Sequence, residues 1–308
     1  MSVSTVRTSR RTDAPAPRDI HAEITEKLIA SIESDPGQPA LPWRRRSKPL
    51  FMPENALTRK PYNGINVVSL WVSAEVSAYE APVWATYRQW SELGAQVRRG
   101  EKSSLVVFYK EYETEPKPDD DSDDGKRRVA RASHVFNASQ VDGYALPDAL
   151  IPLGPIDRIA SADLFFAAAS ARLEHGGDRA FYRPSTDTIH MPDEQRFCGT
   201  ETMTRSESYF AVLGHEHIHW TGADKRLART FGKRFGDAAY AAEELVAEIG
   251  SAFLCAELGI TDGEPRADHA QYLAQWLKLL KSDPRAIFAA AARASEAVAY
   301  LKSLQGPR

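Results

Sequence analysis

The chain has 308 residues, of which 43% are hydrophobic and 26% are charged, and its formal net charge is −3. These values exclude a mostly disordered or fibrous protein and allow one large domain or two ordinary ones. No run of about 18 apolar residues occurs, so no transmembrane helix is predicted, and the N-terminal arginines precede no apolar run typical of a secretory signal. Two cysteines cannot form a disulfide framework or a four-thiolate zinc site. We therefore expect a reducing, cytoplasmic location.

The first half of the chain predicts a mixed α/β domain over residues 19–146. Residues 1–18 before it are rich in Ser, Thr, Arg and Pro and are expected to form a disordered basic arm. The spacing of apolar residues predicts three helices, over 20–32, 62–74 and 86–93. An apolar run predicts a strand over 105–109 that pairs with a strand over 129–141. The acidic stretch near 113–124 is then an exposed loop between the two strands.

A segment rich in Pro and Gly, 147–156, is expected to link this domain to a second, mainly helical domain over 157–308. The second domain is predicted to open with a helix over 157–174, followed by a strand hairpin over 180–191. Four further helices are predicted, over 203–221, 237–258, 266–281 and 284–304. The predicted fold class is therefore α+β, with the mixed domain first and the helical domain second.

The most specific motif of the sequence is His215-Glu216-His217-Ile218-His219, which matches H-E-x-x-H. Residues four apart share one face of a helix, so the imidazoles of His215 and His219 can bind one Zn²⁺. Glu216 can reach a water molecule at the metal and act as its general base. His217 lies off this face and is expected to pack, in the core or on the surface, rather than to bind the metal.

Catalytic zinc usually has a third protein ligand, and a predicted helix over 240–254 offers three glutamates. We predict that Glu244 is the third ligand and that Glu248, one turn later on the same face, orients a ligating histidine. Glu243 is expected to face solvent, although it could exchange roles with Glu244. Tyr240 is either a donor to an oxyanion near the metal or a packing residue.

A basic segment precedes the acidic stretch. Residues 36–110 carry eleven Lys or Arg and five Glu, a net charge of +6, and they contain four of the six tryptophans. Cations that follow a phosphate backbone, combined with aromatic rings for stacking, suit single-stranded nucleic acid, although core packing and a solvated charged face are alternatives. The candidate DNA contacts from this segment are Trp43, Arg44, Arg45, Arg46, Tyr62, Tyr87, Arg98, Arg99 and Lys102.

Two sets of motifs together resemble the ArdC-type antirestriction proteins. The resemblance to their N-terminal domain, which also opens some plasmid primases, rests on Asn63-Gly64-Ile65-Asn66, Leu70-Trp71, Trp84-Ala85-Thr86-Tyr87-Arg88-Gln89 and Val97-Arg98-Arg99-Gly100-Glu101-Lys102. The resemblance to their zincin-like metallopeptidase domain rests on His215-Glu216-His217-Ile218-His219-Trp220-Thr221-Gly222 and Glu243-Glu244-Leu245-Val246-Ala247-Glu248. It covers about residues 20–305 and implies a domain that binds single-stranded DNA, fused to a zincin. It also adds Asn63 and Asn66 to the candidate DNA contacts.

The resulting hypothesis is a cytoplasmic antirestriction protein that shields plasmid DNA entering a recipient cell during conjugation. It would bind single-stranded DNA and carry one Zn²⁺, or another divalent transition metal, at a metallopeptidase site. Its expected partners are single-stranded DNA and a protein substrate that could belong to a restriction system, with no membrane involved. Two alternatives stay open: a DNA-coating protein whose metal is only structural, and a DNA-dependent metalloprotease that acts on proteins bound to DNA.

Overall fold

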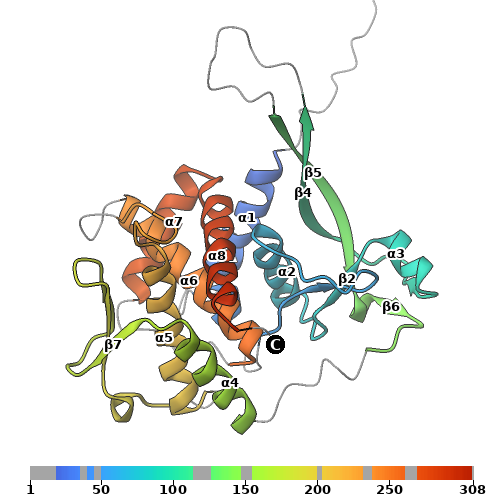
Figure 1. Cartoon of the computed structure of the whole chain (residues 1–308). Helices are drawn as coiled ribbons and strands as arrows, with labels where there is room; N and C mark the ends of the chain where they lie inside the picture. The colour runs from blue at the N-terminus through green and yellow to red at the C-terminus, as the bar shows by residue number, and fades with distance from the viewer. Residues whose placement is uncertain are drawn as a thin grey trace, which may run out of the picture.

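The computed structural model describes residues 19–34, 40–44, 50–113, 126–146, 155–199, 203–231, 238–260 and 269–306. Figure 1 shows a small sheet with a projecting two-stranded ribbon on one side of the molecule and a mainly helical part on the other. The predicted arm over 1–18 and nearly all of the predicted acidic loop and linker lie outside the described residues. The expected α+β class is confirmed, and none of the described helices is long and apolar enough to cross a bilayer.

The sheet of the N-terminal part has the strand order β1-β2-β5-β4. The strands are β1 (Glu54–Asn55), β2 (Val83–Ala85), β4 (Ser104–Glu113) and β5 (Lys126–Asn137). β4 and β5 pair antiparallel along ten positions, from Ser104 opposite Val135 to Glu113 opposite Lys126. The two predicted strands are therefore confirmed and extend further toward the loop, as the ribbon of Figure 1. At its other end β5 stops at Asn137 instead of continuing to residue 141, because a short 3₁₀ helix, Ala138–Gln140, follows it. A second pair, β3 (Gln96–Val97) with β6 (Val141–Asp142), flanks α3 (Tyr87–Glu92), which begins at a Thr86–Gln89 capping box.

Helix α2 (Ile65–Val76) contacts β4, the edge strand of this sheet, through polar side chains. The Asn66 Nδ2 donates to the Val107 carbonyl over 2.8 Å, and the Val107 N–H donates to Asn66 Oδ1 over 2.7 Å. The Ser69 hydroxyl donates to the Leu105 carbonyl over 2.8 Å. An edge strand presents backbone groups without strand partners, and Asn66 supplies those partners here. Asn66 is 5% exposed, so its expected role as a DNA contact is wrong.

The C-terminal part begins with α4 (Pro155–Ala168) and a three-stranded sheet of order β7-β9-β8. Its strands are β7 (Arg172–His175), β8 (Phe181–Arg183) and β9 (Thr188–Met191). The predicted hairpin is confirmed, but the helix predicted over 157–174 ends at Ala168, and residues 172–175 form a strand parallel to β9. No Gly or Pro separates the two elements in the sequence, so only pairing with β9 reveals the change from helix to strand.

Four helices complete this part, each close to its predicted bounds: α5 (Arg205–Thr221), α6 (Ala238–Leu258), α7 (His269–Ser282) and α8 (Ala286–Ser303). α6 packs against α5, α7 and α8 and is buried along most of its described length. A Cβ atom on Gly250 of α6 would lie 2.8 Å from two carbons of Ile218 on α5. Glycine at this position therefore allows the close approach of the two helices that carry the metal-site residues described below.

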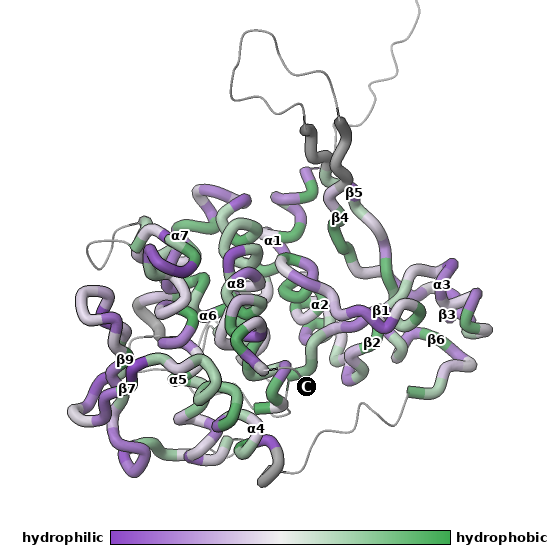
Figure 2. Tube along the Cα trace, in the orientation of Figure 1, coloured by the Kyte–Doolittle hydropathy of each residue, from purple (hydrophilic) through white to green (hydrophobic). Residues whose placement is uncertain are grey.

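The two parts share one hydrophobic core. α1 (Ile20–Ile32) contacts α7, and α2 contacts α8. The rings of Trp71 in α2 and Phe253 in α6 lie 5.5 Å apart, and the Gly64 N–H donates to the Ser295 hydroxyl over 2.9 Å. Figure 2 shows hydrophobic stretches along α2, α6 and α8, where the parts meet. The described N- and C-terminal parts thus pack into one body.

Candidate metal centre and nucleic-acid surface

Helix α5 places the two motif histidines on one face. It begins at Thr204, whose hydroxyl accepts the Glu207 N–H while the Glu207 carboxylate accepts the Thr204 N–H, a capping box that fixes the helix start. About three turns after this start, His215 Nε2 and His219 Nε2 lie 3.2 Å apart. Glu244 of α6 approaches both, with carboxylate oxygens 3.5 Å from His215 Nε2 and 3.5 Å from His219 Nε2.

These three side chains fit a divalent transition metal. Ligand atoms bound at about 2.0–2.2 Å in a tetrahedron lie roughly 3.3–3.6 Å from one another. The observed separations are close to this spacing: 3.2 Å between the two Nε2 atoms, and 3.5 Å from each Nε2 atom to one of the two carboxylate oxygens of Glu244. Among the described residues, this is also the group of His, Cys, Asp and Glu whose ligand atoms converge within 4.8 Å. Two imidazoles and one carboxylate are donors typical of a catalytic zinc site.

A buried chain of charges orients His219. Its Nδ1 lies 3.2 Å from Glu243 Oε1, and Glu243 receives bonds of 3.0 Å and 2.8 Å from the Nε and Nη2 of Arg229. With Nδ1 donating to Glu243, the Nε2 lone pair of His219 faces the metal position. Glu243 is 5% exposed, so the expectation that it faces solvent is wrong. The reason is that α6 is covered by neighbours on several sides, whereas the prediction assumed one solvated face.

The carboxylates dominate the electrostatics of this centre. Burial alone would lower the pKa of His219, but Glu244 and Glu243 outweigh it and raise that pKa to about 10. Burial would raise the pKa of Glu244, yet the charges and hydrogen bonds of His219 and His215 hold it well below its ordinary value. The site therefore favours a positive charge between the imidazoles and Glu244, and a metal cation supplies one.

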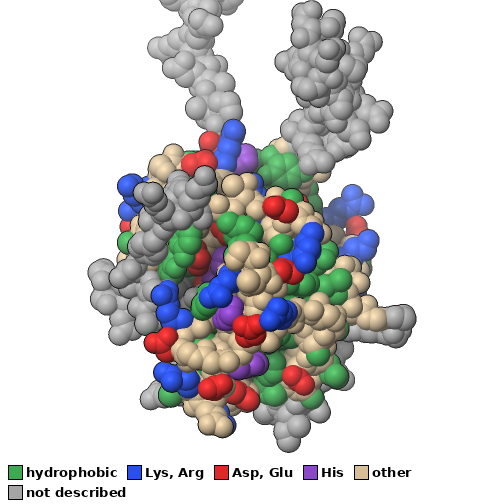
Figure 3. All heavy atoms as spheres, turned by 60° about the vertical axis from the view of Figure 1, so that its left-hand side comes forward, with side chains coloured by type: hydrophobic (Ala, Val, Ile, Leu, Met, Phe, Trp, Pro, Cys, Tyr) green, Lys and Arg blue, Asp and Glu red, His purple; other side chains and the backbone are tan. Residues whose placement is uncertain are grey.

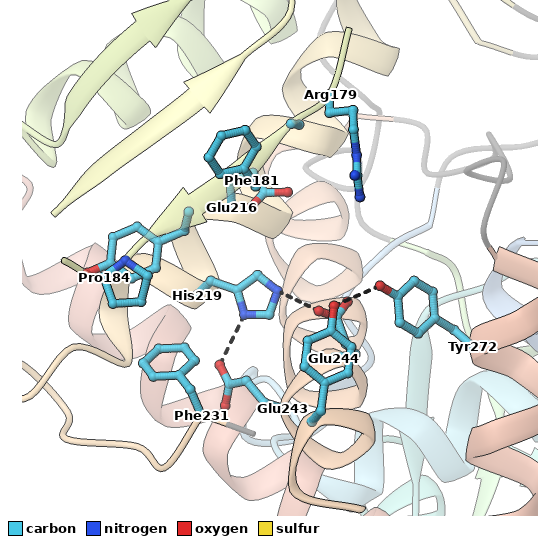
Figure 4. A pocket seen from close by; sticks show the side chains of 12 residues that line it. Arg179, Phe181, Pro184, Glu216, His219, Phe231, Glu243, Glu244 and Tyr272 are labelled. Carbon is cyan, nitrogen blue, oxygen red and sulfur yellow. Dashed lines mark hydrogen bonds and ion pairs between the residues drawn. The ribbon is translucent and has the colours of Figure 1, made fainter. Parts of the chain in front are cut away.

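Glu216 and Tyr240 share a cavity of about 230 Å³ with this centre. Figure 4 shows Glu216, His219 and Glu244 around the cavity, with Phe181 and Phe231 on one side and Tyr272 on the other. The hydroxyls of Tyr240 and Tyr272 lie 2.9 Å apart. In Figure 3 acidic and histidine side chains are visible within a hollow of this face. Tyr240 therefore lies at the site rather than in remote packing, which keeps its role as an oxyanion donor open.

Two further candidate residues, His217 of α5 and Glu248 of α6, are buried. His217 is 0% exposed, its Nδ1 lies 2.9 Å from the Leu213 carbonyl and its ring packs on Phe166, so of core and surface packing the structure shows core packing. Burial lowers the pKa of His217 to about 4. Glu248 is 1% exposed, and its role in orienting a ligating histidine stays a prediction.

Four side chains, Asp187, Arg226, Lys225 and Tyr182, form a cluster that we call the latch; it joins β8, which lines the cavity, to the loop after α5. Asp187, in the turn between β8 and β9, accepts bonds of 3.2 Å from Arg226 Nη1 and 2.8 Å from the Tyr182 hydroxyl, and pairs with Lys225 over 2.8 Å. Arg226 follows α5, is 5% exposed in its side chain, and lies 3.8 Å above the Trp220 ring. The hydrogen bond from Arg226 is the main reason that the pKa of Asp187 lies well below its ordinary value. The latch thus ties β8 to the loop after α5.

We expect Asp187→Asn to lower the free energy of unfolding by about 1–3 kcal/mol at neutral pH, because Arg226 stays buried with a weaker partner. Asn tolerates the left-handed backbone at this position, where φ is 51°. Because folding depresses the pKa of Asp187, its contribution is present above the unfolded value of 3.8 and is lost as pH falls below it. The difference between wild type and variant in urea unfolding should therefore shrink below about pH 4. Asp178→Asn, an exposed change in the preceding loop, is the control; an equal effect of both would contradict the latch.

The structure removes further residues from the predicted DNA surface. Trp43 is 1% exposed and packs 5.9 Å from the Trp71 ring, and Tyr62 is 7% exposed and accepts a bond from Asn55. Both belong to the hydrophobic core, and α1 and α2 contact the short helix that carries Trp43, so their predicted stacking on bases is wrong. The Arg44 side chain, Arg45 and Arg46 lie outside the described residues, and Asn63 is exposed at the turn before α2.

The remaining candidates gather around a shallow depression of about 600 Å³ beside α3 and β3. Tyr87 is 54% exposed there and accepts a bond from Gln96. Arg98 is anchored to Glu101 over 2.9 Å and to the Ser139 carbonyl. The structure places Tyr87, Arg98 and Arg99 along this depression, with Lys102 exposed nearby.

Comparison with known proteins finds a matching family for the N-terminal part of the chain and another for the C-terminal part. Residues 18–136 match the family described as the N-terminal domain of anti-restriction factor ArdC, and residues 160–293 match the zincin-like metallopeptidase family. The crystal structure of the metal-free antirestriction protein ArdC from plasmid R388 superposes with a TM-score of 0.71 at 39% identity, covering 93% of this chain and 98% of that one. The chain belongs to the ArdC antirestriction family. The Mn(II)-bound structure of R388 ArdC is similar as well, with a TM-score of 0.71 at 37% identity.

Two proteins are related to this ArdC-family chain by sequence over most of its length. The uncharacterized protein y4eC of Sinorhizobium fredii is 41% identical over 94% of this chain and 93% of its own length. DNA primase TraC of Escherichia coli is 37% identical over 92% of this chain, which spans 27% of that primase. The family resemblance expected from the motifs is therefore confirmed, and an ArdC-like unit also occurs within a longer protein.

Several residues at the site of this ArdC-family protein have no motif in the sequence that would predict them. Arg229 and Phe231 follow α5 without any motif, and Tyr272 and Arg179 come from a different helix and a loop. No spacing rule connects these positions to the histidine motif. Only the buried Glu243, directly before a predicted ligand, had a usable sequence signal.

Proposed function

We propose that this ArdC-family protein binds single-stranded DNA through its N-terminal part, hydrolyses peptide bonds at the metal centre, and protects incoming plasmid DNA in the cytoplasm of a recipient cell. The observation that carries the enzymatic half is the convergence of His215, His219 and Glu244, two of which line one cavity together with Glu216. The DNA-binding half is supported by the exposed aromatic and basic side chains beside α3.

His215, His219 and Glu244 would hold the metal, which we expect to be Zn²⁺ and which would act as a Lewis acid toward a peptide carbonyl. Glu216 takes the proton of the attacking water and later passes it to the leaving amine. Glu243 keeps His219 in the tautomer that presents Nε2. Burial, with the bond to Tyr272, raises the pKa of Tyr240, so its hydroxyl stays protonated at neutral pH and can donate to the oxyanion.

Metal analysis combined with a protease assay, with and without single-stranded DNA, tests this function. Hydrolysis by metal-loaded protein that is independent of DNA supports the proposal as stated. Hydrolysis only with DNA supports the DNA-dependent protease. Metal binding and DNA protection without hydrolysis of any protein offered would support the coating protein with a structural metal.

We expect Tyr87→Ala to weaken binding of single-stranded DNA by about 1–3 kcal/mol if a base stacks on this ring, with little change in salt dependence. Arg99→Ala should instead reduce the slope of log affinity against log salt by about 0.7, the value for one phosphate contact on a single strand. Fluorescence anisotropy of a labelled oligonucleotide at several salt concentrations measures both quantities.

The matched control for these variants is Arg88→Ala. Arg88 neighbours Tyr87 but pairs with Glu92 over 2.9 Å, and it does not line the depression. It should leave affinity nearly unchanged. Equal losses of affinity in all three variants, or tighter binding of duplex than of single-stranded DNA, would contradict the proposal that this surface binds single-stranded DNA.

A further inference from the structure

We propose that Arg179 determines substrate specificity by binding the carboxylate of an Asp or Glu side chain close to the scissile peptide bond. This inference rests on the proposed peptidase function and names the class of peptide that the same cavity accepts. It starts from the position of Arg179, which lines the cavity together with Glu216 and Glu244.

Arg179 reaches the cavity from the loop that leads into β8. Figure 4 shows its side chain extending from the strand side of the cleft, with the guanidinium directed toward the space between Glu216 and Tyr272. The residue is exposed, and within the described part of the chain no carboxylate forms an ion pair with it. By contrast Arg229, which is buried, donates to Glu243, to the Thr221 hydroxyl and to the Ile218 carbonyl. Arg179 therefore has its donors available to a ligand.

The charge balance of the cavity points to an anionic group. The two charges of a divalent ion would offset Glu244 and Glu216, and Arg229 already offsets Glu243. Arg179 then remains as the net positive charge among the described residues that line the cavity. A guanidinium in a recess with aromatic walls binds a carboxylate through two parallel hydrogen bonds, more strongly than on an open surface.

The size and lining of the cavity favour a peptide over nucleic acid. The cavity measures about 230 Å³ and is walled by Phe181, Tyr182 and Phe231, which suits one or two amino-acid side chains. Glu216, Glu243 and Glu244 also line it. A polyanionic backbone would meet these carboxylates with several phosphates, whereas an acidic peptide brings a single negative charge to Arg179.

The test uses metal-loaded full-length protein and a set of peptides in which Asp or its neutral isostere Asn occupies each position of one sequence in turn. We expect wild type to prefer Asp over Asn at one position by about tenfold in kcat/KM, the size expected for one charge-assisted hydrogen bond. In Arg179→Ala this ratio should fall to about one, and in Arg179→Glu it should invert. Arg172→Ala is the control, because Arg172 lies on the same sheet, pairs with Glu174 and does not line the cavity; it should keep the wild-type ratio.

Calorimetric binding of the same peptides to metal-loaded Glu216→Gln protein separates this inference from the proposed function. Preferential binding of the Asp peptide that depends on Arg179, without turnover in wild type, would contradict the peptidase while supporting the Arg179 contact. Turnover of the peptides without a preference for Asp over Asn would contradict the Arg179 contact but not the peptidase function. If an oligonucleotide competes with the peptides in the wild-type protein and this competition is lost in Arg179→Ala, Arg179 binds phosphate, and the inference of a peptide carboxylate is overturned.

Discussion

Glu216→Gln is expected to lower kcat/KM for peptide hydrolysis by about 10²–10⁴-fold, the range that general base catalysis contributes. The amide has nearly the shape of the carboxylate but cannot accept the proton of the attacking water. Glu216 is not one of the three converging ligand residues, so metal content should stay near that of wild type. Hydrolysis of a fluorogenic peptide and elemental analysis of the same sample measure the two effects.

The control for this change is Glu257→Gln, a substitution of the same kind at a glutamate that pairs with Lys302 far from the metal cavity. It should leave hydrolysis unchanged. A conjugation assay against a restricting recipient then addresses the biological role. Protection that survives in Glu216→Gln would favour the DNA-coating alternative, whereas full hydrolysis by Glu216→Gln would rule out Glu216 as the base.

His219→Ala is expected to remove most of the bound metal and with it the stabilisation that metal binding confers. A ligand present at about a thousand times its dissociation constant stabilises the folded state by about 4 kcal/mol. The variant should therefore unfold at the same temperature with and without added Zn²⁺, whereas wild type should unfold at a higher temperature when Zn²⁺ is present. Thermal unfolding with a metal titration checks this prediction.

His190→Ala serves as the histidine control. His190 lies on β9, its ring stacks on Phe181 with a centroid distance of 4.6 Å, and it is not one of the converging ligands. The control should bind one metal ion per chain. Full metal occupancy in His219→Ala would refute the ligand assignment. A loss of stability in His219→Ala that is equally large without metal would indicate a packing role instead.

Much of the centre could be predicted because its chemistry is local. Two histidines four residues apart must share a helix face, and a glutamate next to the first must lie beside that face, whatever the rest of the chain does. Helix bounds such as Ile20–Ile32 were equally accessible, because the period of the apolar residues is a property of a short segment. The same reasoning indicated that His217 is a packing residue and not a metal ligand.

The tertiary structure alone decided which side chains are covered. Trp43 was a candidate DNA contact because of its basic and aromatic segment, and Asn66 because of the family resemblance. In the structure Trp43 is buried against Trp71, and Asn66 pairs with the backbone of an edge strand. Glu243 has the sequence environment of a solvated glutamate, but α6 is enclosed by other helices and Arg229 neutralises it. Periodicity shows which residues share a face, whereas burial depends on the distant segments that pack on that face.

The sequence by itself determined the helix that carries His215, Glu216 and His219, the acidic helix that follows it, and the family. Only the fold decided that Glu244 reaches the histidines, that Glu243 orients His219, and that Arg179 lines the cavity. The physical reason is the range of the interactions involved. Backbone hydrogen bonds and apolar spacing act within a few residues, but a metal cavity forms where separate elements converge, and that convergence is fixed by packing over the whole core.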